Sequence, residues 1–189
     1  MKFDIILAGV GGQGVLSVAA IIARGAMKDN LLIRQSEVHG MSQRGGAVSA
    51  HLRLSDKPIA SDLIGKGSAE LILSMEPLES LRYLSYLKSD GMVITSSNPL
   101  ENIPVYPDIP ALYDYINSLP NARLIDAEAL ARLAGSIRAT NMVMVGAASF
   151  FLPIKPVTLE ASIQELFRNR GNAIIAINLK AFHLGREEK

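Results

Sequence analysis

The feature that most constrains the fold is a short apolar run that ends in glycines and continues as an amphipathic segment. Residues 3–8 read FDIILA, which suits a buried strand, and the glycine-rich stretch GVGGQG follows at once. The apolar positions beyond it recur at helical spacing and predict a helix over residues 12–28. These positions are Val15, Val18, Ala19, Ile22 and Ala26. A strand, a glycine turn and a helix form the first half of a βαβ unit.

Further apolar segments predict that strands and helices alternate along the rest of the chain. Strands are expected at residues 31–36, 48–54, 69–75 and 92–96, with a weaker strand at 124–125. Helices are expected after Pro77, after Asp126 as an N-cap, over residues 141–152, around residues 159–167 and after residues 171–172. Residues 99–110 contain four prolines and are expected to form a surface connection.

This alternation predicts a three-layer α/β/α sandwich with a Rossmann-like, mostly parallel sheet, and a single domain over residues 1–189. Residues 48–54 (VSAHLRL) alternate between apolar and polar, which favours a half-exposed strand and allows it to run antiparallel. His51 in this strand is expected to be a structural or surface residue, and His183 in the last helix is expected to face solvent.

The composition excludes several classes of function. The formal net charge is +1 and the 19 basic residues are scattered, whereas a nucleic-acid binder usually has a concentrated basic face. The chain has no cysteine, which excludes disulfides, thiolate nucleophiles and cysteine-ligated iron–sulfur clusters. The first residues lack a signal-peptide pattern, and the longest apolar stretch, residues 142–154, is too short to span a bilayer. We therefore expect a cytoplasmic protein that binds neither nucleic acid nor membrane.

The glycine loop at residues 9–14 fits G-x-G-x-x-G between a strand and a helix, the context that a dinucleotide fingerprint requires. Glycine lets the backbone turn tightly and approach a ligand, and the first N–H groups of the helix can bind an anion. Three roles stay open: a tight turn that only packs helix on sheet, a dinucleotide site, and a site for another phosphate or a shared interface. A P-loop is excluded, because Val15 and Leu16 follow the last glycine. The candidate binding residues here are Gly9, Gly11, Gly12, Gln13 and Gly14.

Residues 35–46 (QSEVHGMSQRGG) crowd polar side chains and glycines directly after the second predicted strand. Ligands of α/β proteins bind beyond the carboxyl ends of strands, so this segment should lie beside the glycine loop. Arg44 could clamp a phosphate or carboxylate, and Glu37 and His39 could exchange a proton or orient each other. Glu37 is also the nearest acid for a dinucleotide site, while the alternative is a solvated polar loop. The candidate binding residues here are Glu37, His39, Gln43 and Arg44.

Other catalytic arrangements are absent from the sequence. The serines of residues 35–46 lack the G-x-S-x-G elbow that surrounds the nucleophile of many serine hydrolases. The three histidines are separated and show no H-x-x-x-H spacing, so they do not predict a metal site.

Two motifs together resemble a known family. GVGGQGV at residues 9–15 and SEVHGMSQRGG at residues 36–46 resemble the gamma subunit, or gamma domain, of 2-oxoacid:ferredoxin oxidoreductases. The segment HGMSQRGG is most similar to the small beta subunit of indolepyruvate oxidoreductase. Asn141 with Gly146, and residues 178–182 with Gly185, extend the resemblance over nearly the whole chain.

The resemblance implies a function within a complex. Enzymes of this family decarboxylate a 2-oxoacid on thiamine diphosphate, pass electrons through iron–sulfur clusters to ferredoxin and release an acyl-CoA. This chain has no cysteine for a cluster and no Gly-Asp-Gly element of a thiamine diphosphate motif, to which residues 89–91 (SDG) come nearest. The resemblance therefore implies a non-redox subunit that binds none of these cofactors alone. A larger partner would carry thiamine diphosphate and the clusters and pass electrons to ferredoxin.

In such a complex, residues 11–14 and 37–46 would face the partner near the active site and the CoA route. Their implied roles are packing, closure and contacts with a phosphate or acyl group, without a proton-transfer step. The alternative, based on G-x-G-x-x-G alone, is a stand-alone Rossmann-like oxidoreductase that binds NAD(P) or FAD.

Overall fold

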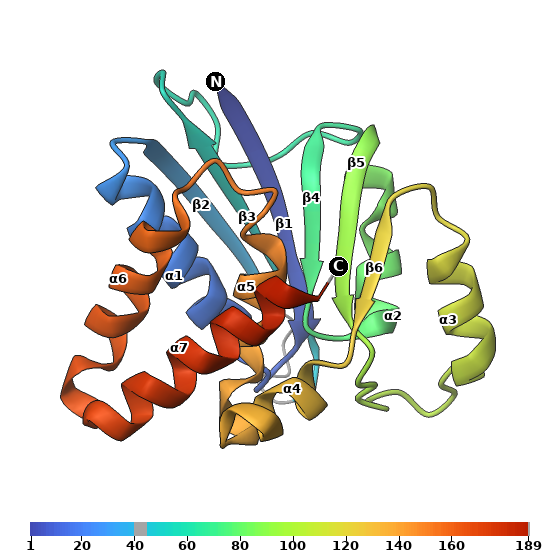
Figure 1. The fold of residues 1–189 in the computed structure, drawn as a ribbon. Coiled ribbons are helices and arrows are strands. Elements are labelled where there is room, and N and C mark those ends of the chain that lie inside the picture. Colours follow the sequence, from blue (N-terminus) through green and yellow to red (C-terminus); the bar gives the residue numbers. More distant parts are fainter. Residues whose placement is uncertain (40–44, 189) are drawn as a thin grey trace.

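The computed structural model describes residues 1–39 and 45–188, the side chain of His39 excepted. Within these residues the chain forms a six-stranded sheet in the order β2-β3-β1-β4-β5-β6 (Figure 1). The strands are β1 (Lys2–Val10), β2 (Leu32–His39), β3 (Ala47–Ser55), β4 (Ala69–Ser74), β5 (Leu87–Ser96) and β6 (Ala122–Ile125). β1, β4, β5 and β6 run parallel, and β3 runs antiparallel to both of its neighbours. The predicted sheet, mostly parallel with an antiparallel strand, is confirmed.

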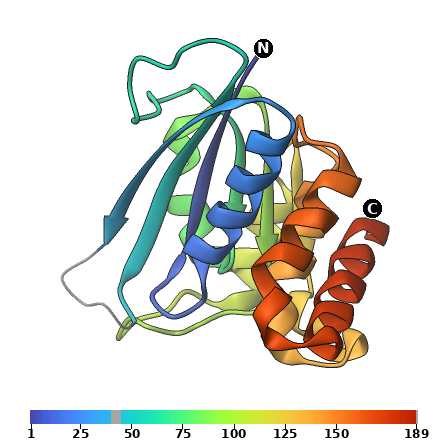
Figure 2. The same ribbon diagram turned by 90° about the vertical axis from the view of Figure 1, so that its left-hand side faces the viewer.

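Helices cover both faces of this sheet. They are α1 (Val15–Lys28), α2 (Pro77–Arg82), α3 (Ile109–Asn117), α4 (Ala127–Ala134), α5 (Thr140–Ala148), α6 (Pro156–Phe167) and α7 (Asn172–Glu187). Seen along the sheet, α1, α6 and α7 form a layer on one side (Figure 2). α2 lies on the other side, with α3 beside β6 (Figure 1). The predicted three-layer arrangement is therefore correct, although the two helical layers differ in size.

The larger hydrophobic core lies between the sheet and α1, α5, α6 and α7. Its fully buried side chains include Leu7, Ile22, Val143, Leu159 and Phe182. α5 is apolar around its whole circumference and almost entirely buried, as expected for a helix enclosed by others. It crosses α7 so closely that Gly146 and Gly185 each meet the backbone of the other helix.

The smaller core on the opposite face explains a prediction that was wrong. β3 is buried along nearly its whole length, whereas its alternating sequence predicted a half-exposed strand. The reason is that residues 56–68 fold back over it. Arg53 donates hydrogen bonds to the carbonyls of Ser61 and Leu63, at 2.9 and 2.8 Å, and Ile64 is buried against Ile72. The polar side chains of β3 thus hold a covering loop and do not face water.

Several element boundaries also differ from those expected. α1 begins at Val15, because Gly12 and Gly14 have φ angles of 105° and 79° and cannot be helical. α5 ends at Ala148, four residues before the predicted end. α3 was not predicted, because its start falls among the prolines of residues 99–110; Asp108 caps it by accepting from Ala111 N–H at 3.1 Å.

In the described part of the chain, no helix combines the length and the apolar character that a bilayer crossing requires.

His51 is a structural histidine, as expected. Its Nδ1 accepts a hydrogen bond from the backbone N–H of Ile64 at 2.9 Å, which requires this nitrogen to be unprotonated. Burial, and then the charge of Arg53, lower the pKa of His51. His183 keeps about half of its side chain exposed, also as expected.

His51 makes stability depend on pH. Below about pH 6.5 the unfolded chain protonates this side chain, while the folded chain keeps it neutral, so the free energy of unfolding should fall as the pH falls. Urea unfolding at about pH 7.5 and about pH 5.5 measures this decrease. His51→Asn, which keeps an acceptor for Ile64, should show a smaller decrease than the wild type, and the exposed His183→Asn should behave like the wild type. Equal decreases in both variants would contradict the assignment.

Candidate functional site

The glycine loop joins the carboxyl end of β1 to α1, and its conformation depends on Gln13. The Gln13 Oε1 accepts a hydrogen bond from Val10 N–H at 2.8 Å, and its Nε2 donates to the Met75 carbonyl at 3.3 Å. A Cβ on Gly9 would lie 2.8 Å from Val15 Cγ2 and 3.0 Å from the same Gln13 Oε1. The Gln13 amide therefore fixes the loop against the end of β4, and the lack of a side chain at Gly9 lets α1 pack on it.

The last glycine of the loop touches a distant part of the chain. Gly14 has a left-handed φ of 79°, and a Cβ there would lie 2.4 Å from Asn141 Nδ2. Asn141 in the first turn of α5 also donates to the Gly14 carbonyl at 3.4 Å. The glycine loop and the start of α5 thus form one junction.

A cleft of about 410 Å³ opens at this junction. It lies beyond the carboxyl ends of β1, β4 and β5, where open α/β sheets bind ligands. Its floor includes Gly12, Gly14 and the buried Met75. The polar side chains around it are those of Gln13, Ser96, Asn98, Glu128, Arg138, Thr140 and Asn141. Amides, hydroxyls, one guanidinium and one carboxylate suit the binding of a polar or charged ligand.

One wall of the cleft comes from the segment between β5 and α3, residues 97–108, which we call the strap. Asn98, Pro99 and Leu100 of the strap line the cleft. The Ser96 hydroxyl donates to Asn98 Oδ1 at 2.8 Å and accepts from the Asn98 N–H at 3.1 Å. The Asn98 Nδ2 in turn donates to Asp126 Oδ1 at 3.1 Å. The strap is therefore fixed to the ends of β5 and β6 where it enters the cleft.

The second predicted polar segment also approaches the glycine loop. Gly11 N–H donates to the Gly46 carbonyl at 2.8 Å, and Gly45 N–H donates to the Gly11 carbonyl at 3.4 Å. The expectation that these two segments are neighbours in space is confirmed for residues 45–46. Gln43, Arg44 and the side chain of His39 lie outside the described residues.

Glu37 occupies a different position from the acid of a dinucleotide site. It is exposed on β2, where its Oε1 accepts from Gln35 Nε2 at 2.6 Å, and it does not line the cleft. β3 lies between β2 and β1, so Glu37 is two strands, or about 10 Å, away from the strand that carries the glycine loop. In the dinucleotide arrangement the strand with the acid directly neighbours the first strand. The topology therefore argues against the stand-alone dinucleotide enzyme.

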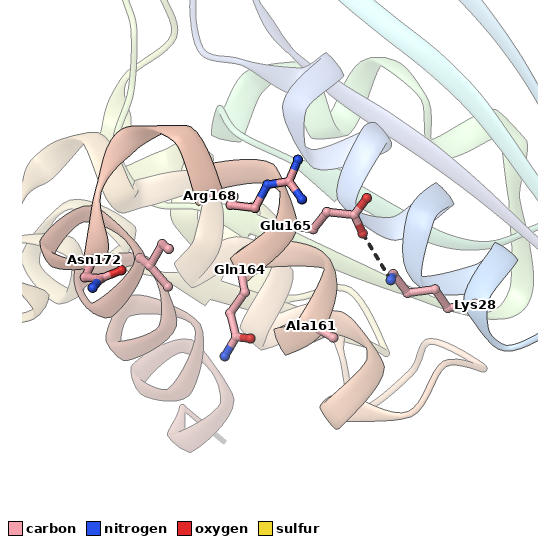
Figure 3. Close-up of a pocket in the computed structure, with 7 residues that line it drawn as sticks. Lys28, Ala161, Gln164, Glu165, Arg168 and Asn172 are labelled. Atoms are coloured by element: carbon pink, nitrogen blue, oxygen red, sulfur yellow. Dashed lines mark ion pairs between the residues drawn. The ribbon is translucent and has the colours of Figure 1, made fainter.

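A second hollow, of about 630 Å³, lies among α1, α6 and α7 (Figure 3). Lys28 and Glu165 form an ion pair there at 3.0 Å, and the hydrogen bond from Lys28 lowers the pKa of Glu165. Arg24 contacts the same carboxylate at 3.1 Å. This hollow shares no residue with the cleft, and its central charges pair with each other, so it is a weaker candidate for a ligand site.

The comparison with known proteins decides the family. The family model described as pyruvate ferredoxin/flavodoxin oxidoreductase matches residues 4–188.

The chain belongs to the pyruvate ferredoxin/flavodoxin oxidoreductase family.

Curated relatives are similar to the chain over nearly its whole length. The indolepyruvate oxidoreductase subunit IorB of Pyrococcus horikoshii is 36% identical over 97% of this chain and 94% of its own. IorB of Methanothermobacter thermautotrophicus is 37% identical over 98% of this chain and 96% of its own. The oxidoreductase gamma-type subunit that the paired motifs predicted is thus confirmed, and the chain is a subunit of an enzyme of this family.

Solved structures of pyruvate ferredoxin/flavodoxin oxidoreductase relatives share the fold. A keto/oxoacid ferredoxin oxidoreductase gamma subunit from Geobacter sulfurreducens has a TM-score of 0.71 at 22% identity, covering 98% of this chain and 97% of that chain. The 2-oxoglutarate:ferredoxin oxidoreductase of Magnetococcus marinus has a TM-score of 0.78 at 22% identity. The match covers 98% of this chain but 30% of that longer chain.

Most of the residues that line the cleft were not predicted from the sequence. Asn98, Glu128 and Arg138 come from segments that no motif singles out, and Asn141 stood out only through the family resemblance. One local signal was available nearby, because Pro77 suits the first turn of a helix and so marks the start of α2 behind Glu76, although neither residue lines the cleft.

Proposed function

We propose that this protein is the non-redox small subunit of an indolepyruvate:ferredoxin oxidoreductase. The observation that carries this proposal is its 34–37% identity with four IorB subunits, over at least 97% of this chain and at least 94% of each relative. A larger partner subunit holds thiamine diphosphate and the iron–sulfur clusters, and electrons leave the complex to ferredoxin in the cytoplasm. The chain folds as one domain over residues 1–189.

The residues of this chain support a partner that holds the redox cofactors and a small subunit that holds none. With no cysteine, it offers no thiolate ligand for an iron–sulfur cluster, so the clusters belong to the partner. The cleft fits a different task, because Arg138 and Thr140 stand where the glycine loop meets the start of α5. A guanidinium and helix N–H groups suit a phosphate or carboxylate. In the complex, this edge closes over the partner's active site and the CoA route.

The candidate binding residues take part in this closure in two groups. Gly9, Gly11, Gly12, Gln13 and Gly14 shape the floor of the cleft, and support for this comes from the Gln13 hydrogen bonds to Val10 and Met75. Glu37 and His39 belong to the end of β2, Gln43 and Arg44 follow them in the sequence, and this second group faces the partner beside the glycine loop. None of them transfers a proton in the reaction.

Co-expression with the large subunit of an indolepyruvate oxidoreductase tests the proposal. The two chains should purify together, and the complex should reduce ferredoxin with indolepyruvate and CoA, while the small chain alone shows no turnover. Calorimetric titration of the small chain with NADH, NADPH and FAD supplies the control. Micromolar binding of one of these cofactors, or purification of the chain only as a homo-oligomer with unchanged oxoacid oxidation in a deletion strain, would contradict the proposal.

A further inference from the structure

Glu76 is a buried acid beside the cleft that the sequence did not single out. It directly follows Met75 at the carboxyl end of β4, and only 1% of it is exposed. Its Oε2 accepts from Glu79 N–H at 2.7 Å and so caps α2. Its Oε1 accepts from Leu100 N–H at 3.4 Å and from the Tyr106 hydroxyl. A buried carboxylate is costly unless hydrogen-bonded, and here three donors surround it.

Two of these donors belong to the strap, which has no regular secondary structure of its own. The ends of the strap are held independently of Glu76. Ser97 N–H donates to the Ile125 carbonyl at 2.8 Å, and Asp108 caps α3. Between these ends, Glu76 contacts the strap at Leu100 and at Tyr106. Between the two contacts Asn102 and Ile103 are half-buried, while Val105 is 84% exposed.

The position of the strap determines the shape of the cleft. Leu100, which Glu76 binds through the backbone, is a lining residue together with Asn98 and Pro99. Farther along, Asn102 Nδ2 donates to the Gly45 carbonyl at 2.8 Å, and Gly45 in turn bonds Gly11 of the glycine loop. A shift of the strap would therefore move a wall of the cleft and a contact of its floor.

We propose that Glu76 is a positioning residue that, through its hydrogen bonds to Tyr106 and Leu100, holds the strap as a wall of the ligand cleft. The proposal rests on the proposed function only in assigning the cleft a ligand in the assembled enzyme. Burial of Tyr106 and its hydrogen bond to Glu76 raise the pKa of this phenol, which keeps it a donor at physiological pH.

Two substitutions separate positioning from stability. Tyr106→Phe removes one of the two hydrogen bonds between Glu76 and the strap and leaves the cap of α2 intact. Glu76→Gln keeps one acceptor oxygen for the strap, but it replaces the charged cap. Tyr115→Phe is the matched control, because this tyrosine is 54% exposed on the neighbouring helix α3. Each variant is assembled with the large subunit, and its steady-state kinetics and hydrogen exchange are compared with the wild type.

In the assembled enzyme, Tyr106→Phe should raise KM for CoA or for the oxoacid about tenfold, with kcat changed less than about twofold, as expected for the loss of one hydrogen bond to a charged group. Amide exchange of residues 100–106 should accelerate. Glu76→Gln should lower the melting temperature while giving a smaller change in KM, and Tyr115→Phe should leave both unchanged. The substrate whose KM rises is the one that occupies the cleft.

The proposal is overturned if Tyr106→Phe matches Tyr115→Phe in KM, or if exchange of residues 100–106 stays as slow as in the wild type. Failure of the proposed function has a different signature. A wild-type complex without oxoacid-dependent turnover would reject that function, and the exchange measurement on the full chain would still decide whether Glu76 holds the strap.

Discussion

Gly185→Ala should lower the free energy of unfolding by about 3 kcal/mol or more. At the crossing of α5 and α7, a Cβ on Gly185 would lie 2.0 Å from the Val143 carbonyl oxygen and 2.7 Å from its carbon. These are backbone atoms of a buried helix, so no side chain can rotate away. The helices would have to separate, and the surrounding core would lose contacts.

Each helix contributes a glycine to the crossing, so the prediction can be tested from both sides. A Cβ on Gly146 would lie 2.1 Å from the Phe182 carbonyl oxygen, so Gly146→Ala should be similarly destabilising. Both substitutions raise helix propensity by about 1 kcal/mol, and the clash must outweigh that gain. Denaturant unfolding, followed by circular dichroism, measures the difference in free energy.

Gly25→Ala provides a helical glycine as a control. Its Cβ would meet Leu159 Cδ2 at 2.9 Å and Ile154 Cγ2 at 3.2 Å, which are side-chain atoms and can shift more easily than a backbone carbonyl. The expected change is within about 1 kcal/mol, because the gain in helix propensity offsets the crowding. If Gly185→Ala cost no more than Gly25→Ala, the close crossing of α5 and α7 would be disproved.

Local patterns predicted the parts of the fold that local residues determine. β1, the glycine loop and α1 were predicted because an apolar run, glycines and helical spacing follow one another within 28 residues. The burial of β3 was not, because it depends on residues 56–68 folding back through Arg53 and His51. α3 was missed because Pro110, which suits a first helical turn, was one of several prolines that indicated a connection.

In the candidate site too, local patterns predicted some residues and not others. The glycine loop was found from its motif, and its proximity to residues 45–46 followed from the rule that carboxyl ends of parallel strands share an edge. The strap, Arg138 and Asn141 reach the cleft only through the order of the strands and the path of α5, which no local pattern encodes. The structural role of Gln13 could not be predicted either, because its amide bonds to Val10 and Met75 depend on where β4 ends.

Gly14→Ala should cost about 2–3 kcal/mol of stability, from two separable causes. The first is the left-handed backbone at φ 79°, which costs a residue with a Cβ about 1–2 kcal/mol. The second is the contact of that Cβ with Asn141 Nδ2 at 2.4 Å. Unfolding of the variant by urea gives the sum of the two.

A double-mutant cycle with Asn141→Ala separates these causes. Asn141→Ala alone should cost little, because its bond to the Gly14 carbonyl is long, at 3.4 Å. In the Asn141→Ala background, Gly14→Ala should cost only the backbone strain. The double variant should therefore lose about 1 kcal/mol less stability than the sum of the two single variants. If the two losses in free energy of unfolding were additive, the Asn141 side chain would be able to move away from the added methyl group without cost.

The same cycle bears on function, because Gly14 and Asn141 both line the cleft. In Gly14→Ala, either the floor or the start of α5 must move, so the assembled enzyme should lose activity by more than its stability loss explains. In the double variant the methyl group fits without that movement. If the junction of the glycine loop and α5 sets the shape of the cleft, part of the lost activity should return although one more side chain has been removed.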